Sequence, residues 1–169
     1  GVVTESEALH LIQLRADAMQ QAVPVGQGAM AVILRKSTEE VEALCARVQD
    51  VFPSNYNCPG PITVAGKTEG VDALLAIAET EGIIAKKLAV SIPSHCRLMN
   101  PAMEVLAKEL VSVSFADSAL PVVLNATGTP LCNGVHIKNA VIDQMLLLVR
   151  FEQSLMAISV TGTVVFGEA

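Results

Sequence analysis

The chain has 169 residues, of which 51% are hydrophobic and only 3% aromatic, and it carries a net charge of −6. This size and apolar content allow a buried core, so we expect one domain or two small subdomains. The negative charge and the few aromatic rings argue against a nucleic-acid partner. No apolar run approaches the roughly 18 to 20 residues of a membrane span. Four irregularly spaced cysteines without a C-x-x-C pair and the lack of a signal-peptide pattern favour free thiols in the cytoplasm over a zinc site or a disulfide framework.

A first helix is predicted to begin after Thr4, because Thr4-Glu-Ser-Glu7 has the pattern of a capping box. Its apolar residues recur at helical spacing: Ala8, Leu11, Ile12, Leu14, Ala18 and Met19. Arg15 lies within this stripe, where an unpaired buried charge would be costly. Its guanidinium must therefore reach solvent or a structural carboxylate, or bind the carboxylate or phosphate of a substrate.

Residues 29–91 show strand and helix signals in the order βαββαβ. Strands are predicted at residues 29–34, 51–56, 62–65 and 85–90. The first helix of this unit follows a second capping box at Ser37-Thr-Glu-Glu40, and the second runs from about residue 69 to residue 81, with Gly82 as its stop. This order is that of a ferredoxin-like subdomain, so we expect a compact, four-stranded antiparallel sheet.

His95 follows the last of these strands in the segment Ser91-Ile-Pro-Ser-His95-Cys-Arg-Leu-Met99. Catalytic bases collect at strand ends in open α/β sheets, so His95, next to Ser94 and the rigid Pro93, is a candidate general base. The alternative is a structural or incidental loop histidine. Cys96 is interpreted as a packing residue, because a thiol adjacent in sequence to the base normally points elsewhere.

The pattern changes after His95. Asn100-Pro101 is interpreted as a cap with a first-turn proline, opening a helix. Residues 121–125 form a short apolar run typical of a parallel strand that is covered on both faces. Helices are predicted at about residues 137–147, which include Gln144, and at residues 152–160, and a last strand at residues 163–166. Two strands are too few to cover so many apolar helices, so we expect that strands of this sheet are missing.

Arg15, His95 and Gln144 together point to acyl transfer, but one part is absent. No Ser, Cys or Thr lies in a Gly-x-Ser-x-Gly nucleophile elbow. The chain therefore has the pattern of a catalytic module without its nucleophile.

Several motifs occur in family order along essentially the whole chain. They are Gln13-Leu-Arg15-x-x-x-Met19-Gln20, Ala22-Val-Pro24, Gly28-Ala-Met30-Ala, Asn55-Tyr-Asn-x-Pro59-Gly60, Val90-Ser-Ile-Pro-Ser-His95-Cys-x-Leu-Met99-x-Pro101-Ala, Pro121-Val-Val-x-Asn125 and Gln144. In these motifs the chain resembles the malonyl-CoA:acyl carrier protein transacylases, and most of all the discrete enzymes of type II fatty acid or polyketide synthesis.

The resemblance implies an α/β fold, in which part of an α/β-hydrolase-like large subdomain, residues 1–28 and 92–169, carries a ferredoxin-like small subdomain at residues 29–91. It implies that a serine takes the malonyl group from coenzyme A and passes it to the phosphopantetheine thiol of an acyl carrier protein, with no permanently bound cofactor and no metal. His95 would activate the serine and later the thiol, and Gln144 would orient His95 through its main-chain carbonyl. Arg15 would bind the malonyl carboxylate, and Asn55, Ser94 and Asn125 would line the substrate site.

In the family, the elbow serine and the oxyanion-hole glutamine precede the position of Gly1, so this chain alone is expected to be inactive. Local departures are Pro61 in place of glutamine, Arg35 in place of glycine, and Leu148 and Phe151 in place of proline and tryptophan. These affect loop detail and acceptor docking more than the reaction class. Two alternatives are a non-catalytic module that binds an acyl carrier protein or a small acid, and an acyltransferase domain of a modular polyketide synthase, which differs in the residues before the histidine.

Overall fold

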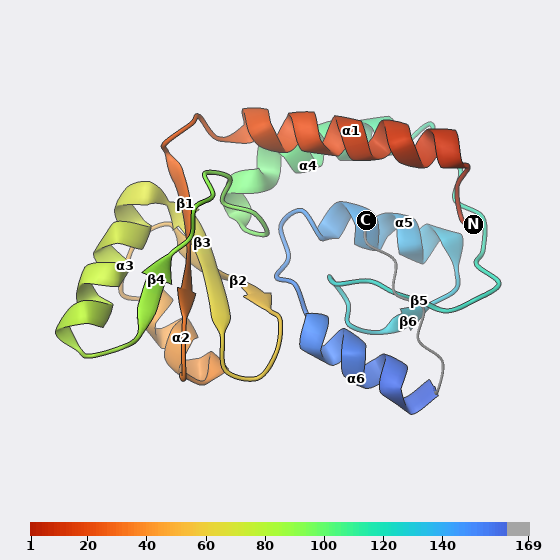
Figure 1. The fold of residues 1–169 in the computed structure, drawn as a ribbon. Helices are drawn as coiled ribbons and strands as arrows, with labels where there is room; N and C mark the ends of the chain where they lie inside the picture. The colour runs from red at the N-terminus through yellow and green to blue at the C-terminus, as the bar shows by residue number, and fades with distance from the viewer. Residues whose placement is uncertain (162–169) are drawn as a thin grey trace.

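The structure, a computed structural model, describes residues 1–161 and has an α/β fold. One part is a four-stranded sheet with two helices, and the other is mainly helical (Figure 1). The strand predicted at residues 163–166 lies outside the described residues. Within residues 1–161, no helix combines the length and the apolar character that crossing a membrane requires.

The first helix, α1 (Glu5–Ala22), begins as predicted at Thr4. The Thr4 hydroxyl accepts a hydrogen bond from the Glu7 backbone N–H (3.2 Å), and the Glu7 carboxylate accepts one from the Thr4 N–H (2.9 Å). Leu11, Ala18 and Met19 are buried, and α1 runs alongside α4 (Asn100–Leu110) (Figure 1). The prediction for Ile12 was wrong: it is 51% exposed, because it lies on the flank of the helix and not on the face that packs.

The four-stranded sheet contains β1 (Gly28–Ile33), β2 (Val51–Tyr56), β3 (Ile62–Lys67) and β4 (Ala85–Lys87), in the spatial order β2-β3-β1-β4. All its pairings are antiparallel. Helices α2 (Thr38–Cys45) and α3 (Thr68–Thr80) connect the strands, so the predicted βαββαβ order and antiparallel pairing are confirmed. Both helices pack against one face of the sheet, in a core that consists of Ala29, Ala31, Ile33, Val41, Leu44, Cys45, Val51, Ile62, Val64, Val71 and Leu74.

The last strand of this sheet is shorter than predicted. β4 ends at Lys87, not at Val90. The Leu88 N–H still donates to the Met30 carbonyl (2.9 Å), but the chain then leaves the sheet and continues to a 3₁₀ turn, η1 (Arg97–Met99), and to α4. Since the sheet is antiparallel and ends well before His95, the strand-end argument for this histidine was wrong. Tertiary contacts determine its position instead.

The helical part differs from the prediction at three places. The predicted parallel strand at residues 121–125 is a two-residue strand, β5 (Val122–Val123), that pairs antiparallel with β6 (Pro130–Leu131), because a short return of the chain provides its partner. Helix α5 (Gly134–Asp143) begins earlier than expected, at the N-cap Asn133, and ends before Gln144, which is its C-cap. Asn100 does not cap α4, because η1 leads directly into the helix. The Asn100 side chain instead donates a hydrogen bond to the Glu104 carboxylate (2.8 Å). The last described helix, α6 (Phe151–Thr161), is as predicted.

A second core joins α1, η1 and α4. It consists of Leu11, Ala18, Met19, Met99, Ala102, Leu106, Leu110, Val113 and Met145. Met99 is the last residue of the His95 segment and Met145 follows Gln144, so this core draws together two segments that are distant in the sequence. A smaller cluster of Met30, Ala65 and Cys96 fixes the same segment to the sheet.

Candidate functional site

His95 lies in the loop between β4 and η1 and is half-buried. Its Nδ1 is 2.8 Å from the main-chain carbonyl oxygen of Gln144. A carbonyl only accepts hydrogen bonds, so Nδ1 must donate, and in the neutral ring the proton is then on Nδ1. This leaves the lone pair on Nε2, which makes Nε2 the atom of His95 that can take a proton.

Burial lowers the pKa of His95, and the positive charge of Arg15 lowers this pKa further, whereas contact with the backbone of Gln144 and Leu147 raises it; the net direction is downward from the ordinary value. A histidine with a lowered pKa is neutral near pH 7. His95 is therefore in the form that a general base requires. The charge of Arg15 is thus within electrostatic range of the imidazole.

Arg15 is oriented by the core that joins α1 to η1. Leu11 and Ala18, on either side of it in the helix, pack in the same cluster as Met99 and Ile92, which flank His95 in sequence. The Nε atom of Arg15 is buried and has no hydrogen-bond partner within residues 1–161, and burial lowers the pKa of the guanidinium. A structural carboxylate, one of the three explanations from the sequence, is not present at Arg15 in the described part of the chain. An anion that binds there would pair with this charge.

Gln144, whose carbonyl binds His95, is followed by a short segment that contacts both Asn55 and Asn125. Asn55 pairs with Val149 through an isolated parallel bridge at the free edge of β2, where the Val149 N–H donates to the Ser54 carbonyl (2.7 Å). The next residue, Arg150, donates its N–H to the Asn125 carbonyl (2.9 Å). The segment that follows Gln144 therefore connects three of the predicted site positions.

A bulge in β2 supports this arrangement. The pairing of β2 with β3 shifts register between Pro53 and Asn55, and the fully buried Ser54 donates its hydroxyl to the Asn55 side-chain oxygen (2.8 Å). Bulges occur next to active sites because they re-aim a side chain. The sequence analysis missed Val149 and Arg150, and no signal could have found them, since both act through backbone groups.

The two residues next to His95 in sequence differ in role. Ser94 is half-buried, and its backbone N–H donates to the Ile92 carbonyl (2.9 Å). Cys96 is 2% exposed, its thiol donates to the Pro93 carbonyl (3.1 Å), and burial raises its pKa to about 11. Its predicted role in packing is confirmed, because a buried neutral thiol is a poor nucleophile.

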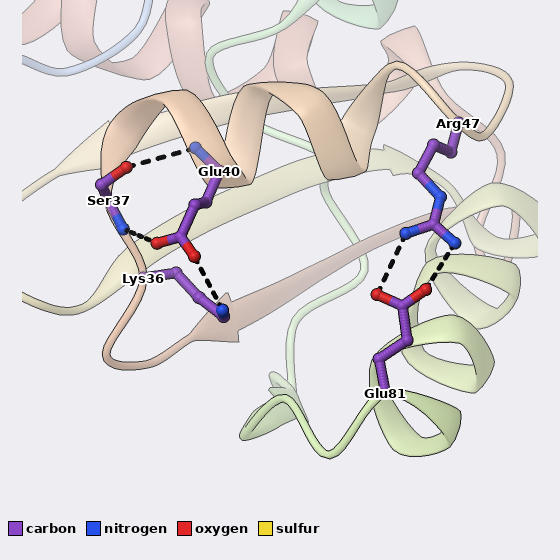
Figure 2. A network of polar contacts seen from close by, with 5 residues as sticks. All are labelled: Lys36, Ser37, Glu40, Arg47 and Glu81. Atoms are coloured by element: carbon purple, nitrogen blue, oxygen red, sulfur yellow. Dashed lines mark hydrogen bonds and ion pairs between the residues drawn. The ribbon is translucent and has the colours of Figure 1, made fainter.

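A hollow of about 230 Å³ lies elsewhere, between α2 and the segment that follows α3. Figure 2 shows that its charged residues pair with one another: Arg47 with Glu81 (2.6 and 3.1 Å) and Lys36 with Glu40 (2.8 Å). The Glu40 carboxylate also accepts from the Ser37 N–H (2.8 Å), which completes the second predicted capping box. Because these charges are already paired, this hollow has none of the features of a binding site for a charged ligand. Within residues 1–161, no group of three or more His, Cys, Asp or Glu could hold a metal ion.

Comparisons with known proteins agree with one another. A family profile described as "Acyl transferase domain" matches residues 1–169. The chain is 36% identical over 166 residues to the malonyl CoA-acyl carrier protein transacylase of Escherichia coli (strain K12), an alignment that covers 96% of this chain and 54% of that protein. It is 33% identical over 175 residues to the Bacillus subtilis (strain 168) protein of the same name, with 99% and 55% covered. The chain thus spans about half the length of these curated relatives.

Two solved structures have the same fold over the shared region. An acyl carrier protein S-malonyltransferase from Vibrio cholerae O1 biovar eltor has a TM-score of 0.90 and 37% identity, with 96% of this chain and 54% of that chain covered. A malonyl-transacylase in complex with a type II PKS acyl-carrier protein also has a TM-score of 0.90, with 36% identity and the same coverage.

Proposed function

Because this chain belongs to the acyl transferase domain family, we propose that it forms part of an enzyme that moves a malonyl group from coenzyme A to the phosphopantetheine thiol of an acyl carrier protein. The observation that carries this proposal is the hydrogen bond between His95 Nδ1 and the Gln144 carbonyl; the buried Nε of Arg15, which has no hydrogen-bond partner within residues 1–161, adds to it. The names of the relatives support the same substrate and acceptor. The acceptor in this proposal is a carrier protein of fatty acid or polyketide synthesis; one neighbour was solved with a type II PKS carrier protein.

In this proposal, His95 is the general base. Nε2 takes the proton of the nucleophilic hydroxyl as its oxygen attacks the thioester carbonyl, and the bond from carbon to sulfur then breaks. The proton on Nε2 passes to the departing coenzyme A sulfur. In the second half-reaction, Nε2 takes the proton of the carrier-protein thiol as its sulfur attacks the carbonyl carbon of the acyl-serine. The bond from this carbon to the serine oxygen then breaks, and Nε2 returns the proton to that oxygen. The lowered pKa of His95 supports this role, because the ring is free to accept a proton near pH 7.

The nucleophile is proposed to be the serine of an elbow that lies outside these 169 residues. Burial raises the pKa of Cys45 to about 12 and of Cys96 to about 11, which makes both thiols unsuited to attack. The proposal therefore includes the expectation that this chain alone does not transfer malonyl groups.

Arg15 is proposed to pair with the malonyl carboxylate, and Asn55, Ser94 and Asn125 to line the substrate site. A guanidinium that is partly buried and unpaired within residues 1–161 is suited to a charge-assisted, bidentate bond with a carboxylate. The shared link of Asn55 and Asn125 to residues 149–150 supports their place near His95.

At the level of the fold, we propose that residues 29–91 form the ferredoxin-like small subdomain and that residues 1–28 and 92–169 form part of an α/β-hydrolase-like large subdomain. The strand order β2-β3-β1-β4 with two helices on one face supports the first assignment. The small size of the β5-β6 sheet is consistent with the second, if further strands of the large subdomain come from other parts of the polypeptide.

The test uses the complete polypeptide that contains this chain, with malonyl-CoA or acetyl-CoA as donor and a phosphopantetheinylated carrier protein as acceptor. Arg15→Ala is expected to abolish malonyl transfer while acetyl transfer holds or rises, because only malonate needs a partner for its charge. Arg47→Ala, at an exposed pair away from His95, is the matched control and should leave both rates unchanged. A parallel loss of both activities in Arg15→Ala would mean that Arg15 is structural, and absence of transfer with binding of the carrier protein intact would favour the non-catalytic module.

A further inference from the structure

The backbone at His95 has an unfavourable conformation. Its φ is +58°, in the left-handed region that residues with a side chain rarely adopt. Such a conformation is strained and persists only where neighbouring contacts determine it. The contacts that hold this loop therefore also decide where the imidazole points.

One of these contacts is made by a residue that lacks a side chain. A Cβ atom placed on Gly28, at the start of β1, would lie 2.7 Å from Pro93 Cγ and 2.8 Å from the Ser91 carbonyl oxygen, and closer still to Pro93 Cδ. These distances are too short for real atoms, so the proline can only lie here because residue 28 is glycine. Pro93 is fully buried. In Figure 1 the segment between β4 and α4 passes across the start of β1.

Gly28 itself is held in place. It pairs with Lys67 in the antiparallel ladder of β1 and β3. The preceding turn is bonded to the start of α3: the Thr68 hydroxyl donates to the Gly26 carbonyl (2.7 Å), and the Thr68 N–H donates to the Gln27 carbonyl (3.0 Å). A side chain at residue 28 would therefore displace Pro93 more readily than it would displace the strand.

Displacement of Pro93 would be transmitted to His95. The Pro93 carbonyl accepts the hydrogen bond of the Cys96 thiol (3.1 Å), so the backbone on both sides of His95 forms one tight turn. The Met99 N–H donates to the Cys96 carbonyl (2.9 Å), which ties the turn to the one buried residue of η1. His95 lies within this turn, and its Nδ1 reaches Gln144 from there.

We infer that Gly28 is a positioning residue for His95: the missing side chain allows Pro93 to pack against β1, and this packing holds the imidazole with Nδ1 directed at the Gln144 carbonyl. The inference deepens the proposed function and rests on it for its catalytic meaning. The structural part of the inference can be tested without an enzyme assay.

The test is the tautomer of His95 in the full chain, measured by long-range ¹H–¹⁵N NMR correlations at about pH 8, where an imidazole is neutral. His95→Asn identifies the signal among the three histidines. The native chain is expected to show the Nδ1–H tautomer alone, because the carbonyl only accepts. Gly28→Ala is expected to show a mixture of the two tautomers, since the ring no longer reaches Gln144.

Two further variants make the result specific. Gly70→Ala is the matched control: its Cβ would meet Val51 Cγ2 at 2.8 Å and the Gln49 carbonyl oxygen, a clash of similar severity in α3 but without contact to Pro93. It should keep the Nδ1–H tautomer. In Gly28→Ala combined with Pro93→Ala, the ring atoms that lie closest to the new Cβ are absent, and only the Ser91 carbonyl oxygen remains too close. Without the ring, this segment can shift by the few tenths of an ångström that the carbonyl needs, so the Nδ1–H tautomer should return.

A folded Gly28→Ala chain that keeps the native tautomer would overturn the inference, and so would tautomer mixing in Gly70→Ala. If Gly28→Ala does not fold, the combined variant decides: recovery of the fold with the native tautomer supports the inference, and failure to recover contradicts it. In the complete polypeptide, Gly28→Ala should lower kcat for malonyl transfer by on the order of a hundredfold with little change in KM. The native tautomer pattern in a polypeptide without any transfer activity would contradict the proposed function and leave the positioning role intact.

Discussion

Replacing Arg15 by methionine is expected to stabilise the folded chain, although it would remove the proposed carboxylate ligand. The Nε–H of Arg15 is buried without a hydrogen-bond partner within residues 1–161. A buried donor that loses its bond to water and gains no other raises the free energy of the native state. Methionine keeps an apolar chain of similar length and has almost the same helix propensity as arginine, so packing and helix formation should change little.

The magnitude follows from the single buried atom. An unsatisfied buried polar group costs about 1 to 3 kcal/mol, and we take the lower end because the remainder of the Arg15 side chain is only partly buried. The free energy of unfolding should therefore rise by about 1 kcal/mol. With a urea dependence of about 2 kcal/mol per M, the midpoint of unfolding should move up by about 0.5 M.

The same substitution should raise the pKa of His95, because the positive charge of Arg15 lowers it. Arg15→Lys separates the two effects: it removes the buried Nε–H but keeps the charge, so stability should rise while the pKa of His95 stays closer to the native value. The assays are urea unfolding followed by circular dichroism and an NMR titration of His95. A midpoint that falls or stays unchanged in Arg15→Met would refute the reasoning, because the guanidinium would then be satisfied in the folded chain.

Three further predictions concern His95, Arg35 and Gln144. The free energy of unfolding should decrease as the pH falls below about 6.5, because the pKa of His95 is lowered in the folded chain and the unfolded chain then binds more protons; urea unfolding between pH 7 and pH 5 measures this. Arg35→Gly should raise the stability by about 0.5 to 1 kcal/mol in urea unfolding, since Arg35 has φ +58° and relief of about 1 to 2 kcal/mol of left-handed strain exceeds the entropic cost of glycine. Gln144→Ala in the complete polypeptide should change malonyl transfer by less than about tenfold, whereas His95→Ala should lower it by on the order of 10² to 10⁴-fold, because Gln144 acts through its main-chain carbonyl.

Each of these predictions has its own control. His95→Asn keeps a side-chain donor on a residue type that tolerates a positive φ, but it removes the titrating ring. The free energy of unfolding should therefore change less between pH 7 and pH 5, and an unchanged slope would assign the pH dependence to other groups. Arg35→Ala retains the strained conformation and should bring no gain, and equal gains in Arg35→Ala and Arg35→Gly would contradict the strain argument. A loss in Gln144→Ala as large as in His95→Ala would show that the Gln144 side chain has a role of its own.

The sequence alone was sufficient where structure depends on neighbouring residues. Both capping boxes, at Thr4 and at Ser37, formed as predicted, because their partners lie three residues away on the same chain. The alternation of strands and helices in residues 29–91 has the predicted order, and the short connection between β2 and β3 accounts for the antiparallel pairing of these two strands. Arg15 could be selected for the same reason, as a charge among residues at helical spacing.

The errors occurred where distant contacts overrule a local pattern. Residues 88–90 are apolar enough for a strand, but the chain leaves the sheet there, and Pro93 packs against Gly28. Residues 121–125 have the composition of a buried parallel strand, but the described partner is the antiparallel β6. Composition predicts that a segment will be buried, but only the fold determines which element packs on it or pairs with it.

The sequence by itself therefore determined the elements and the residue types available for chemistry, and the tertiary structure decided their arrangement. The partner of His95 is a main-chain carbonyl 49 residues away, and Asn55 meets Val149 through a backbone bridge. Every residue except proline carries the same N–H and C=O groups, so such contacts leave no trace in the residue types. The left-handed backbone of His95 depends on packing around Pro93 and Cys96, and packing between segments distant in the sequence exists only once the chain has folded.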